Sequence, residues 1–202
     1  MEYNLYKTEQ MKNKLYNLPI EIDTLKDPIV PEFILFEREN KPVKIIDKKL
    51  SWKIFKRSDS YIADAIGHPG YDKFLQTYPD RTEGYAEGNY LINIPLGHSK
   101  LKDDYAVPNL FADAEYQPKA WRWMYWGPPE CGTNIHVDVD HSCAWNVSIR
   151  GYKHWWFWFD GKMVTTVQEP GEIIYTPNDI LHGVRNLTTS LAITHNYKRK
   201  NG

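Results

Sequence analysis

From about residue 90 onward, the chain is a series of short aromatic or β-branched runs separated by Gly, Pro, Asn and Asp. Such runs are typical of β-strands, and dipeptides such as Asp160-Gly161 suit the tight turns between them. Because no helical pattern interrupts the runs, we expect antiparallel pairing in a barrel or sandwich, which excludes a doubly wound parallel sheet. The predicted strands are 90–96, 121–127, 133–139, 142–149, 153–159, 162–168, 171–177, 181–187 and 190–197.

The N-terminal part of the chain has a different pattern of apolar positions. It predicts short helices at 3–17, 31–38 and 59–66, with a strand from Pro42 to Asp47. We therefore expect this part to form a flank of short helices and a strand that precedes the barrel.

A chain of 202 residues and 23.8 kDa is long enough to bury a core without disulfide support. No repeat, low-complexity tract or Gly/Ser linker divides it. We therefore predict one domain over 1–202, with an N-terminal flank of helices and short strands at 1–80 and a barrel core at 90–197.

The net charge of −1 provides no overall attraction to nucleic acid or to an anionic membrane. Residues 41–57 carry seven Lys or Arg against the single acid Asp47, and a solvated face is the simpler interpretation of this segment. Cys131 and Cys143 lack metal-type spacing and are expected to be reduced thiols. With no secretory signal and no run long enough to cross a bilayer, we expect a cytoplasmic or nuclear protein that does not bind membranes.

Two histidines and one aspartate are the candidate metal ligands. His136 and Asp138 are two residues apart in a predicted strand, so both side chains would point to the same face. His182 lies in a later run that could return beside the first on the far side of a barrel. Two histidines and one carboxylate with open coordination positions form the facial triad of non-haem Fe(II) oxygenases.

The spacing of these ligands is weak support when taken alone. On spacing alone, a strand-edge histidine beside a surface acid is the favoured explanation of His136 and Asp138. A lone histidine such as His182 is more often a satisfied core or surface residue than a ligand. Other residues of the chain therefore have to decide between the two interpretations.

Lys153 is the residue that favours a binding site, because it opens a strand whose next residues are HWWFWF. A lysine facing an apolar barrel needs an anionic partner, such as the distal carboxylate of a keto acid. Thr133 and Thr194 could donate hydroxyl hydrogen bonds to the same carboxylate, with Asn146 as an amide donor nearer the metal. Each has a structural alternative, because Thr is a favoured strand residue and Asn146 could cap a bulge.

The stretch from Trp121 to Tyr197 resembles the jumonji-C (JmjC) oxygenases of the cupin superfamily. The resemblance is carried by WRWMYWGPPECGTNIHVDVDHSCAWNVSIRGYKHWWFWF and EPGEIIYTPNDILHGVRNLTTSLAITHNY, and KDDYAVPNLFAD also matches, most closely the small lysyl-hydroxylase branch. It covers about half of the chain. The resemblance implies a mostly β fold, a double-stranded β-helix of the cupin or jelly-roll type.

Carried over by position, the resemblance implies that Fe(II) binds to His136, Asp138 and His182. It further implies that the C5 carboxylate of 2-oxoglutarate binds to Lys153, Thr133 and Thr194, that Asn146 lies beside this co-substrate, and that Trp123 lines its pocket. With dioxygen as the second co-substrate, the chain would be a 2-oxoglutarate-dependent dioxygenase. It would hydroxylate a protein or peptide side chain, with lysine as one candidate.

Three other functions stay open on the sequence alone. They are a metal-dependent cupin enzyme that uses no 2-oxoglutarate, an oxygenase acting on nucleic acid or methylated residues, and a non-catalytic barrel that binds RNA through the segment 41–57. The interval from Lys153 to His182 is short for the lysyl-hydroxylase branch, so we expect a reduced substrate lid. The dimerisation helices of many relatives would follow Tyr197, so we expect a monomer or a weak dimer.

Overall fold

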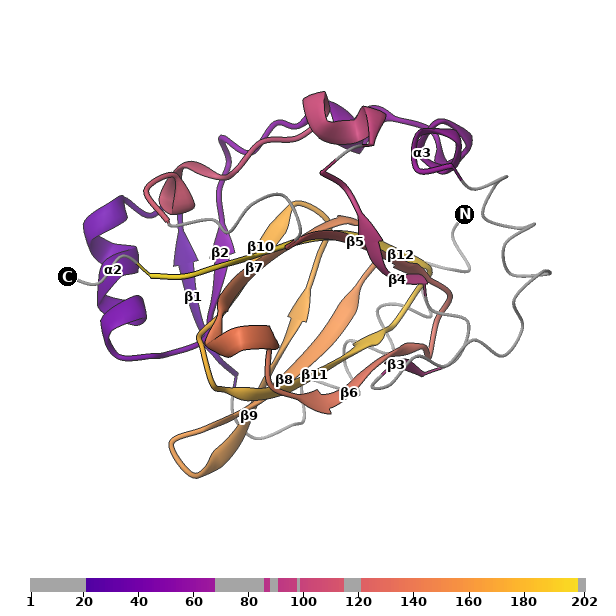
Figure 1. The fold of residues 1–202 in the computed structure, drawn as a ribbon. Coiled ribbons are helices and arrows are strands. Elements are labelled where there is room, and N and C mark those ends of the chain that lie inside the picture. Colours follow the sequence, from indigo (N-terminus) through magenta and orange to yellow (C-terminus); the bar gives the residue numbers. More distant parts are fainter. Residues whose placement is uncertain (1–20, 68–85, 88–90, 98, 115–120, 200–202) are drawn as a thin grey trace.

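A computed structural model describes residues 21–67, 86–87, 91–97, 99–114 and 121–199. Their strands form two sheets (Figure 1). The larger sheet has the strand order β1-β2-β10-β7-β12-β5-β4, and the smaller sheet has the order β3-β6-β11-β8-β9. In the larger sheet the strands are β1 (Asp23–Lys26), β2 (Val43–Ile46), β4 (Leu91–Pro95), β5 (Arg122–Gly127), β7 (Cys143–Arg150), β10 (Glu172–Thr176) and β12 (Ser190–Tyr197). In the smaller sheet they are β3 (Ala86–Glu87), β6 (Gly132–His136), β8 (Lys153–Phe159), β9 (Lys162–Gln168) and β11 (Leu181–Asn186).

The eight strands from β5 to β12 form the barrel. Strands β5, β12, β7 and β10 lie side by side in one sheet, while β6, β11, β8 and β9 lie side by side in the other. Each of these neighbouring pairs is antiparallel. The chain therefore passes repeatedly between two facing sheets, which is the jelly-roll arrangement. The predicted double-stranded β-helix is confirmed.

The strand predictions hold closely in the C-terminal half. Strands β8, β9 and β12 have the predicted bounds, and Gly151, Gly161 and Gly171 take the positive φ that the predicted turns need. The strand predicted over 133–139 is too long, because β6 ends at His136. The short strands β1 and β3 were not predicted.

The N-terminal flank contains the predicted elements that can be compared. Helix α2 (Val30–Arg38) begins with Pro31 in its first turn, and α3 (Asp59–Ala65) is capped by the Ser58 hydroxyl, which accepts from the Tyr61 amide. The predicted helix at 3–17 lies outside the described residues. The single-domain prediction likewise stays a prediction.

Four 3₁₀ turns complete the connections between the described helices and strands. They are η1 (Lys53–Lys56), η2 (Lys100–Asp103), η3 (Asn109–Phe111) and η4 (Val139–His141). Of these, η4 directly follows the second candidate metal ligand, Asp138.

The core consists of two buried clusters, a larger one between the flank and the barrel and a smaller one among barrel strands. In the larger cluster, Phe33 of α2 packs edge-on against Tyr175 and Phe111, and Trp52 packs near Trp145 of β7. The flank therefore covers the outer face of the larger sheet. The smaller cluster joins residues of β8, β9, β10 and β11, and comprises Ile22, Trp155, Phe157, Val164, Ile174, Ile180 and Val184.

Four of the seven basic residues in the segment 41–57 form ion pairs with described acids. Lys41 contacts Asp23, Lys44 lies 3.8 Å from Glu172, Lys48 lies 2.9 Å from Asp27, and Arg57 lies 2.7 Å from the buried Asp104. These ion pairs reduce the local excess of positive charge. No helix within the described ranges is long and apolar enough to span a membrane.

Candidate metal centre

His136, Asp138 and His182 converge in the barrel. Strands β6 and β11 are neighbours, and His136 and His182 lie directly opposite each other in the register. Their Nε2 atoms lie 3.7 and 3.8 Å from the same Oδ1 atom of Asp138, and one ligand atom from each residue lies within 4.8 Å of the others. These separations are too long for hydrogen bonds and suit three ligands that share one cation.

Asp138 reaches this position although it lies beyond the end of the strand. Strand β6 stops at His136, and Asp138 is the N-terminal cap of η4. Its backbone is still extended, with φ −63° and ψ 155°. The predicted secondary structure is therefore wrong at this residue, but the predicted pairing of an imidazole and a carboxylate on one face is present.

Backbone contacts fix the orientation of both imidazole rings. The Nδ1 atom of His136 lies 2.7 Å from the carbonyl oxygen of Asn134, and the Nδ1 atom of His182 lies 3.0 Å from that of Ile180. A carbonyl oxygen can only accept a hydrogen bond, so each Nδ1 is the donor and each Nε2 carries the lone pair. Both Nε2 atoms thus lie on the side of the rings that faces Asp138.

Burial and charge favour the protonation states that bind a cation. Desolvation lowers the pKa of His182, with the carboxylate of Asp138 opposing this effect. Desolvation raises the pKa of Asp138, but the nearby charges of His182 and His136 outweigh this effect, so the net shift of the Asp138 pKa is downward. A neutral imidazole and an ionised carboxylate are the forms that coordinate metals.

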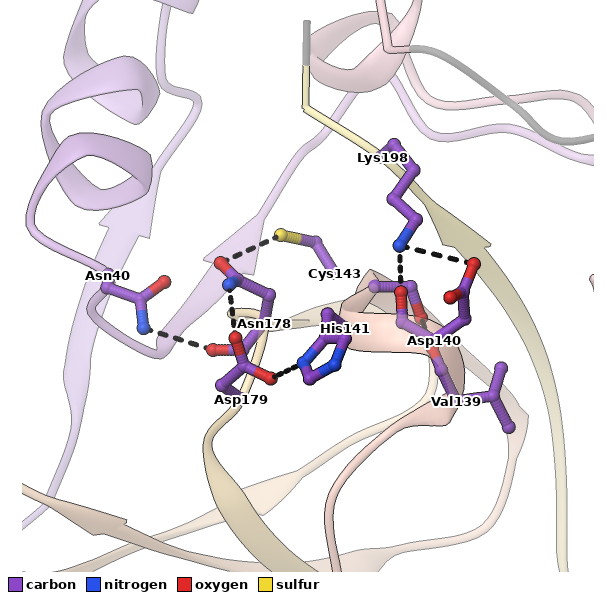
Figure 2. A network of polar contacts seen from close by, with 9 residues as sticks. Asn40, Val139, Asp140, His141, Cys143, Asn178, Asp179 and Lys198 are labelled. Carbon is purple, nitrogen blue, oxygen red and sulfur yellow. Dashed lines mark hydrogen bonds and ion pairs between the residues drawn. The ribbon is translucent and has the colours of Figure 1, made fainter. Parts of the chain in front are cut away.

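Figure 2 shows the polar network that holds the loop after Asp138. His141 lies 2.5 Å from the Asp179 carboxylate, and Lys198 lies 3.3 Å from the Asp140 carboxylate and also contacts its carbonyl oxygen. Asp140 and His141 both have positive φ, 50° and 54°, so the chain reverses sharply here. The loop is therefore tied to the start of β11 on one side and to the end of β12 on the other.

Next to the triad lies a cavity with Lys153 in its wall. Its lining residues are Tyr125, Thr133, His136, Asp138, Ala144, Asn146, Lys153, Trp155, Thr176, His182, Val184 and Thr194. Lys153 is 1% exposed, and its Nζ atom donates to the Oδ1 atom of Asn186 at 2.7 Å. Desolvation lowers the pKa of this ammonium group to about 7, with the Cys131 sulfur opposing the effect. A buried ammonium in a cavity wall is a receptor for an anion.

Two polar side chains in the cavity wall have buried atoms with unused hydrogen-bonding capacity. The Oγ1 atom of Thr133 and the Oδ1 atom of Asn146 have no hydrogen-bond partner among the described residues. The Nδ2 atom of Asn146 donates to the Oγ1 atom of Thr194 at 2.6 Å. Buried polar atoms are normally satisfied, so such atoms in a cavity suit a polar ligand.

The predicted position of Trp123 differs in detail from the structure. On β5 the residue that lines the cavity is Tyr125, two positions further along the same face of the strand. Trp123 pairs with Thr194 in the register, so it lies beside a lining residue. Its role in binding stays a prediction.

Several residues of the site carried no signal in the sequence. Tyr125 and Thr176 line the cavity through strand alternation alone. Asn186 contacts Lys153 because β11 and β8 place the two residues directly opposite each other. That cross-strand register depends on the folded sheet.

Comparison with known proteins finds several relatives that are similar to this chain in sequence. The arginine-specific demethylase JMJ22 of Arabidopsis thaliana is 26% identical over 83% of the chain and 44% of its own length. The bifunctional arginine demethylase and lysyl-hydroxylase psr-1 of Caenorhabditis briggsae is 29% identical over 48% of the chain and 36% of its own length. The chain is therefore similar in sequence to a demethylase and to a bifunctional demethylase and lysyl-hydroxylase.

The 2-oxoglutarate and iron-dependent oxygenase JMJD4 of Mus musculus also matches, with 24% identity over 68% of the chain and 44% of its own length. The chain thus spans less than half the length of these curated relatives. No protein-family model matches. The solved ribosomal oxygenase YcfD of Escherichia coli, in complex with cobalt and 2-oxoglutarate, aligns with 40% of the chain and 24% of its own length at 17% identity, with a TM-score of 0.35.

Proposed function

We propose that the chain is an Fe(II)- and 2-oxoglutarate-dependent oxygenase that hydroxylates a protein side chain. The observation that carries this proposal is the placement of a buried ammonium and the triad of His136, Asp138 and His182 in the wall of one cavity. A metal site alone would fit many cupin enzymes. The buried cation adds a place for an anionic co-substrate beside the metal.

The donor set suits ferrous iron. Two imidazole nitrogens and one carboxylate oxygen form a facial set that leaves coordination positions open, and this set is typical of non-haem Fe(II) oxygenases. When bound, iron and 2-oxoglutarate supply the chemistry: dioxygen is reduced, 2-oxoglutarate is converted to succinate and carbon dioxide, and one oxygen atom is inserted into a C–H bond. The protein supplies geometry, desolvation and binding.

Each cavity residue has a defined task in this proposal. His136 and His182 present lone pairs that their backbone contacts have already oriented, and Asp138 supplies the negative charge. Lys153 would bind the distal carboxylate of 2-oxoglutarate, with the hydroxyls of Thr133 and Thr194 as further donors. No side chain in this scheme acts as a nucleophile or general base.

The cavity composition argues against two of the alternatives. A cupin enzyme without a keto acid would have no use for Lys153, whose burial carries a desolvation penalty that an incoming carboxylate offsets. A non-catalytic barrel would have no use for three oriented ligand atoms around one point. The paired charges of segment 41–57 likewise give no support to RNA binding.

A protein substrate is the proposal best supported by the relatives. The names of psr-1 and JMJ22 refer to arginine and lysine residues of proteins. Hydroxylation and demethylation of such residues yield different products, a gain of one oxygen atom or the loss of a methyl group. Which product forms is decided by mass spectrometry of the peptide substrate.

The experiment that tests the proposal is succinate release from 2-oxoglutarate in the presence of Fe(II) and ascorbate. We expect the wild-type chain to release succinate and the Asp138→Ala variant to release none above background. Equal release by both proteins, or none from a wild-type chain that has been shown to bind Fe(II), would contradict the proposal.

A further inference from the structure

The side chain of Asn186 lies fully buried beneath Lys153. Lys153 opens β8 and Asn186 closes β11, and the two are directly opposite each other in the antiparallel register. Asn186 is 0% exposed, and its Oδ1 atom accepts from the Lys153 ammonium at 2.7 Å. Lys153 lines the cavity, so Asn186 contacts it from below the cavity wall.

Three acceptors on the opposite side fix the orientation of the Asn186 amide. Its Nδ2 atom faces the carbonyl oxygens of Gly127 and Pro128 at 3.3 and 3.2 Å, and the Cys131 sulfur at 3.5 Å. A flipped amide would place its oxygen against those two carbonyl oxygens and its NH₂ against an ammonium. The acceptor atom is therefore held toward Lys153.

The backbone of Asn186 is fixed as firmly as its side chain. Its amide donates to the carbonyl oxygen of Cys131 at 2.8 Å, and its own carbonyl oxygen accepts from the amide of Glu130 at 2.8 Å. The segment between β5 and β6 is thereby joined to the end of β11. Asn186 thus has little freedom to move away from the ammonium.

We propose that Asn186 is a positioning residue that aims the Lys153 ammonium at the distal carboxylate of the co-substrate without neutralising its charge. This inference rests on the proposed function, because it assigns Asn186 to the binding of 2-oxoglutarate. A neutral amide is suited to the task because it accepts one hydrogen bond and leaves the positive charge intact. A carboxylate at this position would pair with Lys153 and compete with the incoming anion.

The charge state of Cys131 bears on the Lys153 ammonium. Cys131 is the titratable group whose charge acts on the ammonium, and desolvation raises the pKa of its thiol to about 11. The thiol is therefore neutral when the co-substrate binds. The Cys131 thiol therefore does not compete with the incoming carboxylate for the ammonium.

The test compares Asn186→Ser and Asn186→Asp with the wild type by isothermal titration of 2-oxoglutarate into protein loaded with Mn(II). A hydrogen bond to a charged group contributes enough that its loss raises Kd about 10- to 100-fold. We expect this increase in N186S and a larger one in N186D, with the Kd for Mn(II) unchanged. Thermal unfolding checks that each variant is folded, and N186S carries the test if N186D does not fold.

A matched control separates positioning from general loosening of the fold. The hydroxyl of Ser148, also fully buried, donates to the carbonyl oxygens of Arg150 and Gly151, away from the cavity lining. The variant Ser148→Ala therefore loses buried hydrogen bonds without touching Lys153, and its Kd for 2-oxoglutarate should match that of the wild type.

The pH profile provides a readout that a merely structural role would not move. Loss of the acceptor disfavours the ammonium form, so in N186S the affinity for 2-oxoglutarate should begin to fall at a lower pH than in the wild type. If N186S binds 2-oxoglutarate within about threefold of the wild type and has the same pH profile, the role of Asn186 is overturned. If the wild type loaded with Mn(II) does not bind 2-oxoglutarate, the proposed function itself is wrong.

Discussion

Replacing Lys153 by Met would separate the two consequences of burying this ammonium group. Burial lowers the pKa of Lys153 from 10.5 to about 7. Each pKa unit corresponds to about 1.36 kcal/mol, so burial disfavours the charged form of Lys153 by about 5 kcal/mol in the ligand-free protein. Lys153 is thus unfavourable for the empty fold and favourable for an anionic ligand. Methionine has a similar length and carries no charge, so it removes the ligand contact while filling the space.

The expected result of Lys153→Met is a selective loss of co-substrate binding. A buried carboxylate left without its cation costs about 3 to 5 kcal/mol, which corresponds to about 150- to 5000-fold in Kd. Isothermal titration of 2-oxoglutarate into Mn(II)-loaded protein should therefore give at least a 100-fold higher Kd, while the Kd for Mn(II) stays within about threefold. The exposed Lys162, replaced by Met, is the matched control and should change neither value. Binding of 2-oxoglutarate to folded, Mn(II)-loaded K153M within threefold of the wild type would refute the reasoning.

Three further predictions concern the triad, the buried ammonium and strand packing. Asp138→Ala should abolish retention of Mn(II) in equilibrium dialysis, because it removes the anionic ligand; retained metal would place the site elsewhere. Between pH 7 and about 10.5, the unfolded chain keeps a proton on Lys153 that the folded protein has released. The wild-type free energy of unfolding, measured in urea titrations, should therefore rise with pH relative to that of K153M. Parallel plots of the two free energies against pH would contradict the lowered pKa. Gly183→Ala places a Cβ atom 2.6 Å from the Trp156 ring and should lower the free energy of unfolding by about 1 to 3 kcal/mol; an unchanged urea midpoint would show that the ring does not lie over this strand.

The barrel strands were predictable because short apolar and aromatic runs fit a strand buried on one or both faces. Strand β8, KHWWFWF, and strand β12, SLAITHNY, were predicted with their observed bounds for this reason. By contrast, β1 and β3 contain four and two residues. Strands this short are stabilised by the neighbour that they pair with, and the sequence does not identify that neighbour.

The candidate site was predictable where local spacing or the family resemblance identified a residue. The triad and Lys153 belong to this group, although the strand holding Asp138 ends earlier than its pattern suggested. Asn186 and Tyr125 do not, because one faces Lys153 through the register of β11 with β8 and the other enters the cavity through alternation along β5. Local sequence specifies the side chain, while the fold specifies its partner across the sheet.

The central claim is that three side chains from separate parts of the chain bind one metal ion. Anomalous diffraction from crystals of the protein containing Mn(II) tests it most directly. We expect one strong peak within about 2.0 to 2.3 Å of the Nε2 atoms of His136 and His182 and a carboxylate oxygen of Asp138. A peak at another position, or none between these residues in a protein that binds Mn(II) in solution, would contradict the account.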